Sequence, residues 1–222
     1  MILNELAIVE STENIAANTF QTFLKSPKLA ASMKPGQFIN ILPSENWDKM
    51  MRRPMSVASQ KDGVISIIYK VVGQGTQLMQ NWSVGDTVDL IGPLGNYWDG
   101  YTDKLSILIG GGVGIAPILN LTNHLDDLGE NKVLIMGARN SSEHFIEHNP
   151  EYGIYMTTDD GSLGIHGNVL DPLKLALENI DFQNVKIFAC GPPAMMEAVR
   201  QFSIRQNIEC DLALETLMAC GF

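Results

Sequence analysis

A change of rhythm near the middle of the chain constrains the fold more than any other feature. Before about residue 100, short runs rich in Ile, Val, Thr and aromatic residues follow one another, separated by Gly, Pro, Asn and Asp. After Tyr101, apolar strand-like runs alternate with helical patterns, which is typical of parallel β/α units with helices on both faces of a sheet. The sequence therefore predicts a small antiparallel β-barrel followed by a parallel-sheet α/β domain.

The first half predicts six strands and one short helix, at residues 2–10, 15–24, 37–42, 55–59, 64–72 and 87–91 and at residues 76–82. The second half predicts five strands and three helices, at residues 105–109, 132–136, 153–157, 185–189 and 208–212 and at residues 115–128, 169–177 and 194–204. The boundary is expected in the turn-rich stretch 92–104, so the two domains are expected to span residues 1–100 and 101–213.

Composition excludes several classes of protein. Acidic residues outnumber basic ones 25 to 15, and nucleic-acid binding needs a basic face, so no nucleic-acid partner is expected. The longest apolar run, 105–121, contains four glycines and a proline and is shorter than the ~20 residues of a membrane helix, so no membrane span is expected. The chain has only three cysteines and no basic stretch followed by an apolar core at its N-terminus, which together predict a reduced, cytoplasmic protein.

A glycine-rich turn opens the second half. The strand 105–109 runs into Gly110-Gly111-Gly112-Val113-Gly114, and a helical pattern follows. Glycines let a backbone approach a ligand closely, and the start of a helix directs free N–H groups at the turn, which suits a pyrophosphate. The alternative is a tight strand–helix turn without a ligand. The flanking strand and helix favour nucleotide binding.

Two further turns are expected at the same edge of the sheet. The strand 185–189 ends in Cys190-Gly191-Pro192, and a loop rich in turn residues follows the strand 153–157 at residues 158–164. Ligands of open α/β sheets bind beyond the carboxyl ends of the strands. The Cys190 side chain could lie against a flat ring, or it could be a buried small hydrophobe, which is commoner for a free cysteine.

The first half contains a cationic group within an acidic chain. Arg52 and Arg53 open one strand, Lys70 closes the next, and residues 73–76 lead into the short helix. Arginine forms bidentate charge-assisted bonds with phosphates, and a helix start adds backbone donors, so this combination suits a pyrophosphate. The alternative is that both arginines are solvated charges at a strand edge.

Seven short motifs occur in order along nearly the whole chain: RPMS, IYK, GQGT, GPLGN, GGGVGIAP, DGSLG and CGPPAMM. Their order and spacing resemble the ferredoxin reductase-like flavoproteins, and most of all the electron transfer subunits of type B dihydroorotate dehydrogenase. The resemblance implies an FAD-binding antiparallel barrel over residues 1–100 and an NAD-binding parallel-sheet domain over residues 101–213.

The resemblance also implies which residues hold the two nucleotides. FAD would contact nine residues of the barrel, namely Arg53, Pro54, Met55, Ser56, Ile68, Tyr69, Lys70, Gly75 and Thr76. NAD would approach Gly111, Gly112 and Gly114, and its nicotinamide would lie beside Cys190, Gly191 and Pro192. Within these sets, Gly75 and Thr76 would bind the FAD pyrophosphate, and Cys190 would lie nearest the redox chemistry.

The end of the chain departs from the family. The family carries a [2Fe-2S] site built from four cysteines, the first in a pattern like Met-x-Cys-Gly, which Met218 to Gly221 match. Residues 214–222 are thus expected to begin a cluster segment, with Glu215 fitting its approach and Cys220 as a metal ligand. One thiolate cannot hold a cluster that takes four ligands, so either the rest of the module is absent from this chain or this version works without it.

The implied function is that of an electron transfer flavoprotein subunit in pyrimidine biosynthesis. A catalytic subunit that contains FMN would oxidise dihydroorotate to orotate, and electrons would pass through the [2Fe-2S] cluster and FAD to NAD+. The resemblance suggests a heterotetramer with two subunits of each kind. Three alternatives stay open: a reductase subunit of another system such as sulfite reductase or hydrogenase, a stand-alone NADH-dependent flavin reductase, and a non-catalytic nucleotide-binding regulator.

The choice between NAD and NADP also stays open. Arg139 follows a strand near the expected ribose end, where its guanidinium could meet a 2′-phosphate or pair with a surface acid. The resemblance favours NAD. No general base is needed from this chain, and the four histidines, scattered over expected helices and loops, receive no role.

Overall fold

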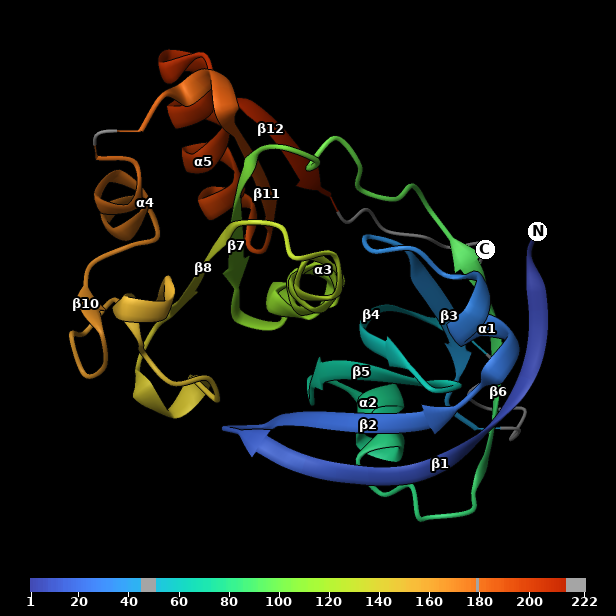
Figure 1. Ribbon diagram of the computed structural model, residues 1–222. Coiled ribbons are helices and arrows are strands. Elements are labelled where there is room, and N and C mark those ends of the chain that lie inside the picture. The colour runs from blue at the N-terminus through green and yellow to red at the C-terminus, as the bar shows by residue number, and fades with distance from the viewer. Residues whose placement is uncertain (45–50, 179, 215–222) are drawn as a thin grey trace. The chain divides into compact units, whose positions relative to one another are not determined.

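The computed structural model describes residues 1–44, 51–178 and 180–214, which form two compact units, Met1–Tyr97 and Trp98–Leu214 (Figure 1). The first unit contains a closed antiparallel barrel with the strand order β1-β2-β5-β4-β3-β6. The second contains a six-stranded sheet with the order β10-β9-β8-β7-β11-β12, and its ladders are all parallel. The predicted fold class is confirmed. Within the described ranges, no helix is long and apolar enough to cross a membrane.

The barrel is built from six strands and two short helices. The strands are β1 (Leu3–Ala16), β2 (Thr19–Lys25), β3 (Phe38–Leu42), β4 (Arg53–Lys61), β5 (Val64–Lys70) and β6 (Thr87–Leu94). The helices are α1 (Pro27–Ser32) and α2 (Gln74–Met79). Every second residue of a strand points inward, as in Ile65, Ile67 and Tyr69 of β5, and these side chains form one buried core. Met79 of α2 belongs to the same core.

The first hairpin differs from its prediction. The polar run at residues 11–14 was expected to separate two strands, but β1 continues through it and pairs with β2 up to Ala16 opposite Thr19. The turn lies at residues 17–18 instead, where Asn18 adopts a positive φ of 52°. Asparagine tolerates this left-handed conformation better than most residues, so it and not the run of polar residues ends the strand.

The second unit has strands β7 (Leu105–Gly111), β8 (Lys132–Ala138), β9 (Ile154–Thr158), β10 (Ile165–His166), β11 (Val185–Cys190) and β12 (Glu209–Ala213). Its α-helices are α3 (Ile115–Leu128), α4 (Leu170–Ala176) and α5 (Pro193–Gln206). The expected strands and helices of this half are present within a few residues. Sequence patterns missed β10, which has only two residues, and α1 of the barrel, which has only six.

The helices cover both faces of the sheet (Figure 1). Alternate residues of β11 belong to different cores: Ile187 packs with α4 and α5, whereas Phe188 packs with α3. These positions are apolar because the strand is buried on both sides. The exception is Lys186, a buried lysine whose Nζ lies 2.7 Å from Glu209 and 2.9 Å from Asp211, both on the neighbouring strand β12.

Candidate functional site

The carboxyl ends of β7 and β11 form the centre of the candidate nucleotide site in the second unit. The two strands are neighbours, with Gly110 opposite Cys190, although β7 leads through α3 to β8 on its other side. Chain connections leave in opposite directions at this point, which is where open α/β sheets bind their ligands. The structure therefore brings together the two predicted glycine turns, at residues 110–114 and 190–192.

Backbone packing explains two of the three predicted NAD-binding glycines. A Cβ atom at Gly114 would lie 2.5 Å from the carbonyl oxygen of Cys190, and one at Gly111 would lie 2.8 Å from Cδ of Pro192. Real Cβ atoms do not approach this closely, so both positions need glycine for the turns to contact each other. Gly191 likewise packs against the backbone of Gly111.

Gly112 has a different environment. Its φ is +55°, and a Cβ atom placed on it would meet nothing within 4 Å. The residue therefore needs glycine for its left-handed backbone, while the space beside it stays open. A 3-10 turn at Gly112–Gly114 leads directly into α3, and the Ile115 N–H already donates to the Gly112 carbonyl, so the N–H groups without an intrahelical partner are those at the start of this turn. Open space beside these donors fits the pyrophosphate of a dinucleotide.

Cys190 ends β11 beside this space. Its side chain is buried, at 4% relative exposure, within the core that α3 covers, whereas Gly191 and Pro192 are more accessible. The Met195 side chain of α5 extends over Gly111 and Gly191. The second described cysteine, Cys210 on β12, is partly buried, and burial raises the pKa of its thiol. Met195 was not predicted as a site residue, and its place in the CGPPAMM motif was the available signal.

The third predicted loop, at residues 158–164, follows β9 at the same edge of the sheet. The Thr158 hydroxyl donates to the Leu163 carbonyl at 2.9 Å and closes the loop. The Ser141 backbone N–H, from the loop after β8, donates to the Ser162 hydroxyl at 2.8 Å. The loops after β8 and β9 therefore form one connected rim.

Strand alternation in the barrel divides the predicted FAD-binding residues into two groups. Met55 and Tyr69 pack with the barrel core, and the Tyr69 hydroxyl lies 3.3 Å from that of Thr22. Burial raises the pKa of the Tyr69 hydroxyl, which keeps it neutral. The alternate positions of the same strands belong to Pro54 and Ser56 on β4 and to Ile68 and Lys70 on β5, of which Ile68 is itself buried, at 4% exposure. These four residues share the outer face of neighbouring strands.

Arg53 lies across the turn that begins α2. A Cβ atom at Gly75 would come within 2.8 Å of the Arg53 Nε, so glycine makes room for this side chain. The Arg53 Nη1 donates to the carbonyls of Met51 at 2.7 Å and Arg52 at 3.2 Å. A guanidinium and the free backbone donors of a helix start thus lie together, a combination that suits a phosphate group.

The Thr76 hydroxyl builds this turn. It accepts the backbone N–H groups of Val72 at 3.0 Å and Gly73 at 3.3 Å, and it donates to the Gly73 carbonyl at 3.1 Å. A hydroxyl with three such contacts already uses its donor and both acceptor sites. Thr76 therefore holds the backbone donors in place, and a ligand would meet the main chain of the turn.

Arg52 has a structural role that the sequence did not separate from that of Arg53. Its Nη2 lies 2.8 Å from the Asp89 carboxylate, and its Nη1 donates to the carbonyls of Asp89 at 3.2 Å and Asn40 at 3.4 Å. These bonds join the residue just before β4 to β6 and β3. Of the two adjacent arginines, only Arg53 contacts the turn at Gly75.

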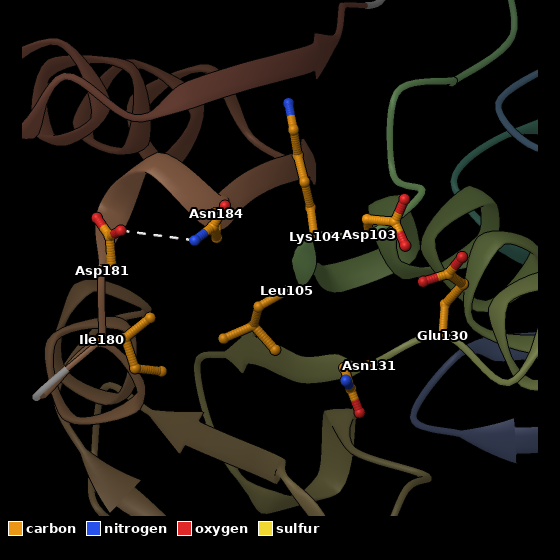
Figure 2. A pocket seen from close by; sticks show the side chains of 8 residues that line it. All are labelled: Asp103, Lys104, Leu105, Glu130, Asn131, Ile180, Asp181 and Asn184. Atoms are coloured by element: carbon orange, nitrogen blue, oxygen red, sulfur yellow. Dashed lines mark hydrogen bonds between the residues drawn. The ribbon is translucent and has the colours of Figure 1, made fainter.

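A hollow in the second unit lies away from these residues. Figure 2 shows it at the amino ends of the strands, next to Leu105 at the start of β7 and Asn184 just before β11. Its volume is about 470 Å3, and the Asn184 amide donates to Asp181 at 3.5 Å on its rim. Ligands of this type of sheet bind at the opposite, carboxyl ends, so the hollow is not part of the candidate site.

The predicted metal ligand Cys220 lies outside the described residues. Within the described ranges, no group of three or more His, Cys, Asp or Glu side chains could hold a metal ion. The two cysteines in those ranges, Cys190 and Cys210, lie on adjacent strands, and a [2Fe-2S] cluster takes four ligands. The described part of the chain alone therefore does not fit a cluster.

Two family models match the chain, each over one of the units. The model of the oxidoreductase FAD-binding domain matches residues 6–98, and that of the oxidoreductase NAD-binding domain matches residues 108–201. The barrel is therefore an FAD-binding domain and the parallel sheet an NAD-binding domain of an oxidoreductase. The predicted cofactors FAD and NAD are confirmed at this level.

Relatives of known name match along the whole chain. The dihydroorotate dehydrogenase B (NAD(+)) electron transfer subunit of Listeria innocua is 36% identical over 100% of this chain and 86% of its own length. The subunit of the same name from Fusobacterium nucleatum is 32% identical over 96% of this chain and 84% of its own. This chain belongs to that family. The family predicted from the seven motifs is confirmed.

Solved structures agree on the fold. One described as an NADH-dependent reduced ferredoxin-NADP oxidoreductase, studied for flavin-based electron bifurcation, has a TM-score of 0.83 and 29% identity, over 97% of this chain and 78% of its own. A ferredoxin reductase of carbazole 1,9a-dioxygenase has a TM-score of 0.77 and 22% identity, over 96% of this chain and 70% of its own. The fold is ferredoxin reductase-like.

Proposed function

We propose that this chain is the electron transfer subunit of a type B dihydroorotate dehydrogenase. It would receive the electrons that an FMN-containing catalytic partner takes from dihydroorotate, and it would deliver them to NAD+. The observation that carries the proposal is the match to subunits of this name along the whole chain, at 36% identity to the Listeria innocua protein. The arrangement of FAD-type and NAD-type domains supports the same conclusion.

The reaction balances without a base from this chain. Dihydroorotate loses two electrons and two protons in becoming orotate, and NAD+ takes up two electrons and one proton, so one proton passes to solvent. A bound FAD supplies the carrier that links the partner to NAD+. Three of the histidines hold backbone or aromatic groups: His124 bonds Tyr101 at 2.9 Å, His144 bonds the Thr157 carbonyl, and His148 accepts the Met156 N–H.

The residues of the barrel would bind and orient FAD. Arg53 and the backbone donors at Gly75 would hold the pyrophosphate, in a turn fixed by the Thr76 hydroxyl. The outward residues Ser56 and Ile68 would contact the flavin, whereas Met55 and Tyr69 would support it from the core. In this proposal the FAD-binding domain spans residues 1–100 and the NAD-binding domain spans residues 101–213.

The residues at the carboxyl edge of the parallel sheet would bind and orient NAD+. The open space at Gly112 would take the pyrophosphate beside the start of α3. The nicotinamide would then lie at the end of β11, against Cys190 and Gly191, and Met195 would shield that end from water.

The visible absorption spectrum of the purified chain, before and after anaerobic addition of NADH, tests the cofactor half of the proposal. Flavin bands that bleach with NADH support it, and a protein that stays colourless after incubation with FAD contradicts it. The partner half needs copurification. Affinity purification of this chain from its native cells should recover a dihydroorotate-oxidising flavoprotein and dihydroorotate-dependent reduction of NAD+.

One alternative has its own support. The structure with a TM-score of 0.83 is 29% identical and belongs to a ferredoxin-NADP oxidoreductase, so a reductase subunit with another redox partner shares the same two domains. Both candidates predict bleaching by NADH. They differ in the partner, since recovery of an iron–sulfur reductase without dihydroorotate oxidation would favour the alternative.

A further inference from the structure

The rim formed by the loops after β8 and β9 lies where the adenosine half of a dinucleotide would extend. Gly111 of β7 pairs with Gly137 of β8, and β9 follows on the far side of β8 from β7. A dinucleotide with its nicotinamide at β11 and its pyrophosphate at Gly112 therefore directs its adenine ribose toward the ends of β8 and β9. In such sheets, acidic residues or arginines near this ribose distinguish a free 2′-hydroxyl from a 2′-phosphate.

Arg139, the residue after β8, is engaged by a carboxylate of its own loop. Its Nε lies 3.2 Å from Oε1 of Glu143, its Nη2 contacts the same oxygen, and its backbone N–H donates to Oε2 at 3.4 Å. The Glu143 side chain is only 12% exposed, whereas that of Arg139 is 71% exposed. The carboxylate is thus the shielded member of the pair, and the guanidinium is the member that solvent or a ligand can reach.

Other carboxylates surround the same rim. Asp159 lies close enough to add to the electrostatic stabilisation of the Arg139 charge, after the larger effect of Glu143. Asp160 follows it, and the Ser162 hydroxyl and N–H hold its carboxylate in place at 2.6 and 3.0 Å. The Arg139 guanidinium is thus stabilised by two carboxylates, those of Glu143 and Asp159, and a third, that of Asp160, lies in the same rim. A phosphate monoester carries about −1.5 to −2 charges at pH 7, so it would be repelled here.

We propose that Glu143 makes this edge selective for a dinucleotide with a free 2′-hydroxyl, because it engages Arg139 and keeps negative charge where a 2′-phosphate would lie. The inference rests on the proposed function, which takes NAD+ as the electron acceptor. Glu143 is then the residue that distinguishes a 2′-hydroxyl from a 2′-phosphate. It also explains why an arginine that suits a 2′-phosphate is compatible with NAD.

Selectivity against a 2′-phosphate does not require a strong ion pair between Arg139 and Glu143. Exposed pairs contribute little to stability, so a phosphate could displace Glu143 from the guanidinium. The displaced carboxylate would still lie within the same loop, next to the bound phosphate. Like charges held together at a binding site weaken binding, so the cost to a 2′-phosphate stays even after displacement.

Calorimetric titration of the FAD-loaded chain with 5′-ADP and with 2′,5′-ADP tests the inference directly. The wild-type chain should bind 2′,5′-ADP at least about tenfold more weakly than 5′-ADP. Glu143→Gln should tighten 2′,5′-ADP binding by about tenfold and change 5′-ADP binding by less than about twofold. Adding Arg139→Ala to Glu143→Gln should remove that gain, since it removes the group that binds the phosphate.

Asp126→Asn is the matched control. Asp126 also pairs with a cation, Lys132, but at the opposite end of β8, so its loss of charge should alter neither titration. Higher salt should reduce the preference of the wild-type chain, because screening weakens exposed charges.

Two results would overturn the inference. Equal affinity of the wild-type chain for both probes would do so, and so would a Glu143→Gln variant that keeps the wild-type ratio. In both cases binding of 5′-ADP leaves the proposed NAD site standing. Binding of neither probe by the wild-type chain would overturn the NAD site and the inference together.

Discussion

At the scale of single residues, adjacent positions of similar chemistry have different roles. The sequence predicts the same role for Arg52 and Arg53, as two cations at the start of a strand. In the structure, Arg52 bonds Asp89 and the carbonyl of Asn40, whereas Arg53 lies over Gly75. The glycines of the 110–114 turn divide in the same way. Gly114 makes room for the Cys190 backbone, and Gly112 faces open space.

Substitution of the two arginines should separate binding from stability. Arg53→Ala should weaken FAD binding by about 10- to 100-fold, because charge-assisted bonds to phosphate are lost, and leave the stability of the apoprotein nearly unchanged. Arg52→Ala should instead lower the free energy of unfolding by about 1–3 kcal/mol, since it leaves partly buried acceptors unpaired. Fluorescence titration with FAD and urea denaturation measure the two effects. Unchanged FAD affinity in Arg53→Ala would contradict its phosphate role.

Gly112→Ala and Gly129→Ala form a second matched pair. Both glycines have a positive φ, +55° and +72°, and a Cβ atom added to either would meet nothing within 4 Å. Each substitution should therefore destabilise the protein by a similar amount, about 1 kcal/mol. Only Gly112→Ala should also weaken NADH binding, because its methyl group enters the space assigned to the pyrophosphate. Equal NADH affinity in both variants, measured by calorimetry, would show that the pyrophosphate lies elsewhere.

At the scale of elements, the sequence predicted what depends on local pattern and missed what depends on neighbours. The strand–turn–helix at Gly110–Gly114 was predictable, since apolar run, glycines and helical repeat are all local. The inward direction of Tyr69 was not, because it depends on which face of β5 the barrel closes around. The partner of Arg139 was left open for the same reason. Nothing in the spacing alone shows that Glu143 folds back onto it.

The position of Cys190 at the end of β11 leads us to expect an effect on the rate of flavin reduction. Cys190→Ala should slow reduction of the flavin by NADH while FAD stays bound, because the substitution alters the surface against which the nicotinamide would lie. Cys210→Ala is the control, since it removes the other described cysteine from the neighbouring strand β12. Anaerobic stopped-flow absorbance measures both rates. Equal rates in the wild-type chain and Cys190→Ala would move the nicotinamide away from β11.

The pairing of β11 with β12 predicts a pH dependence. Burial alone would lower the pKa of Lys186, but its hydrogen bonds to Glu209 and Asp211 outweigh burial and raise it, while bonds from Lys104 and Lys186 lower the pKa of Glu209. The contribution of Glu209 to the free energy of unfolding is thus present when the pH is above 4.5, the ordinary pKa of a glutamate, and it is lost as the pH falls below that value. The contribution of Lys186 to the free energy of unfolding is present when the pH is below 10.5, the ordinary pKa of a lysine, and it is lost as the pH rises above that value.

Lys186→Met should reduce the loss of stability at both low and high pH, because the substitution removes the buried charge that pairs with Glu209 and Asp211. Urea denaturation between pH 3 and pH 11 would follow the change, with Lys132→Met as the control for a surface pair. If the acid limb of Lys186→Met matches that of the wild-type chain, other carboxylates are responsible for it.

At the scale of the whole molecule, the FAD-binding and NAD-binding domains match different compact units of one chain. A ligand stabilises the state that binds it, by about 2.7 kcal/mol at one hundred times its dissociation constant. In hydrogen exchange, FAD should therefore protect residues 53–56 and 68–76 of the barrel. By contrast, 5′-ADP should protect residues 110–116 and 138–143 of the parallel sheet. Protection of the same residues by both ligands would contradict the assignment of FAD to the barrel and of NAD to the parallel sheet.

The strand pairings also set the order in which the sites can arise on the ribosome. The barrel closes when Leu3 of β1 pairs with Gly92 of β6, so all its strands exist once β6 has emerged. The nucleotide edge of the sheet joins Gly110 of β7 to Cys190 of β11, so it cannot form until nearly all of the second unit has been synthesised. Domains generally fold as units during synthesis, the earlier one first. A nascent chain can thus acquire its flavin before its pyridine-nucleotide site exists.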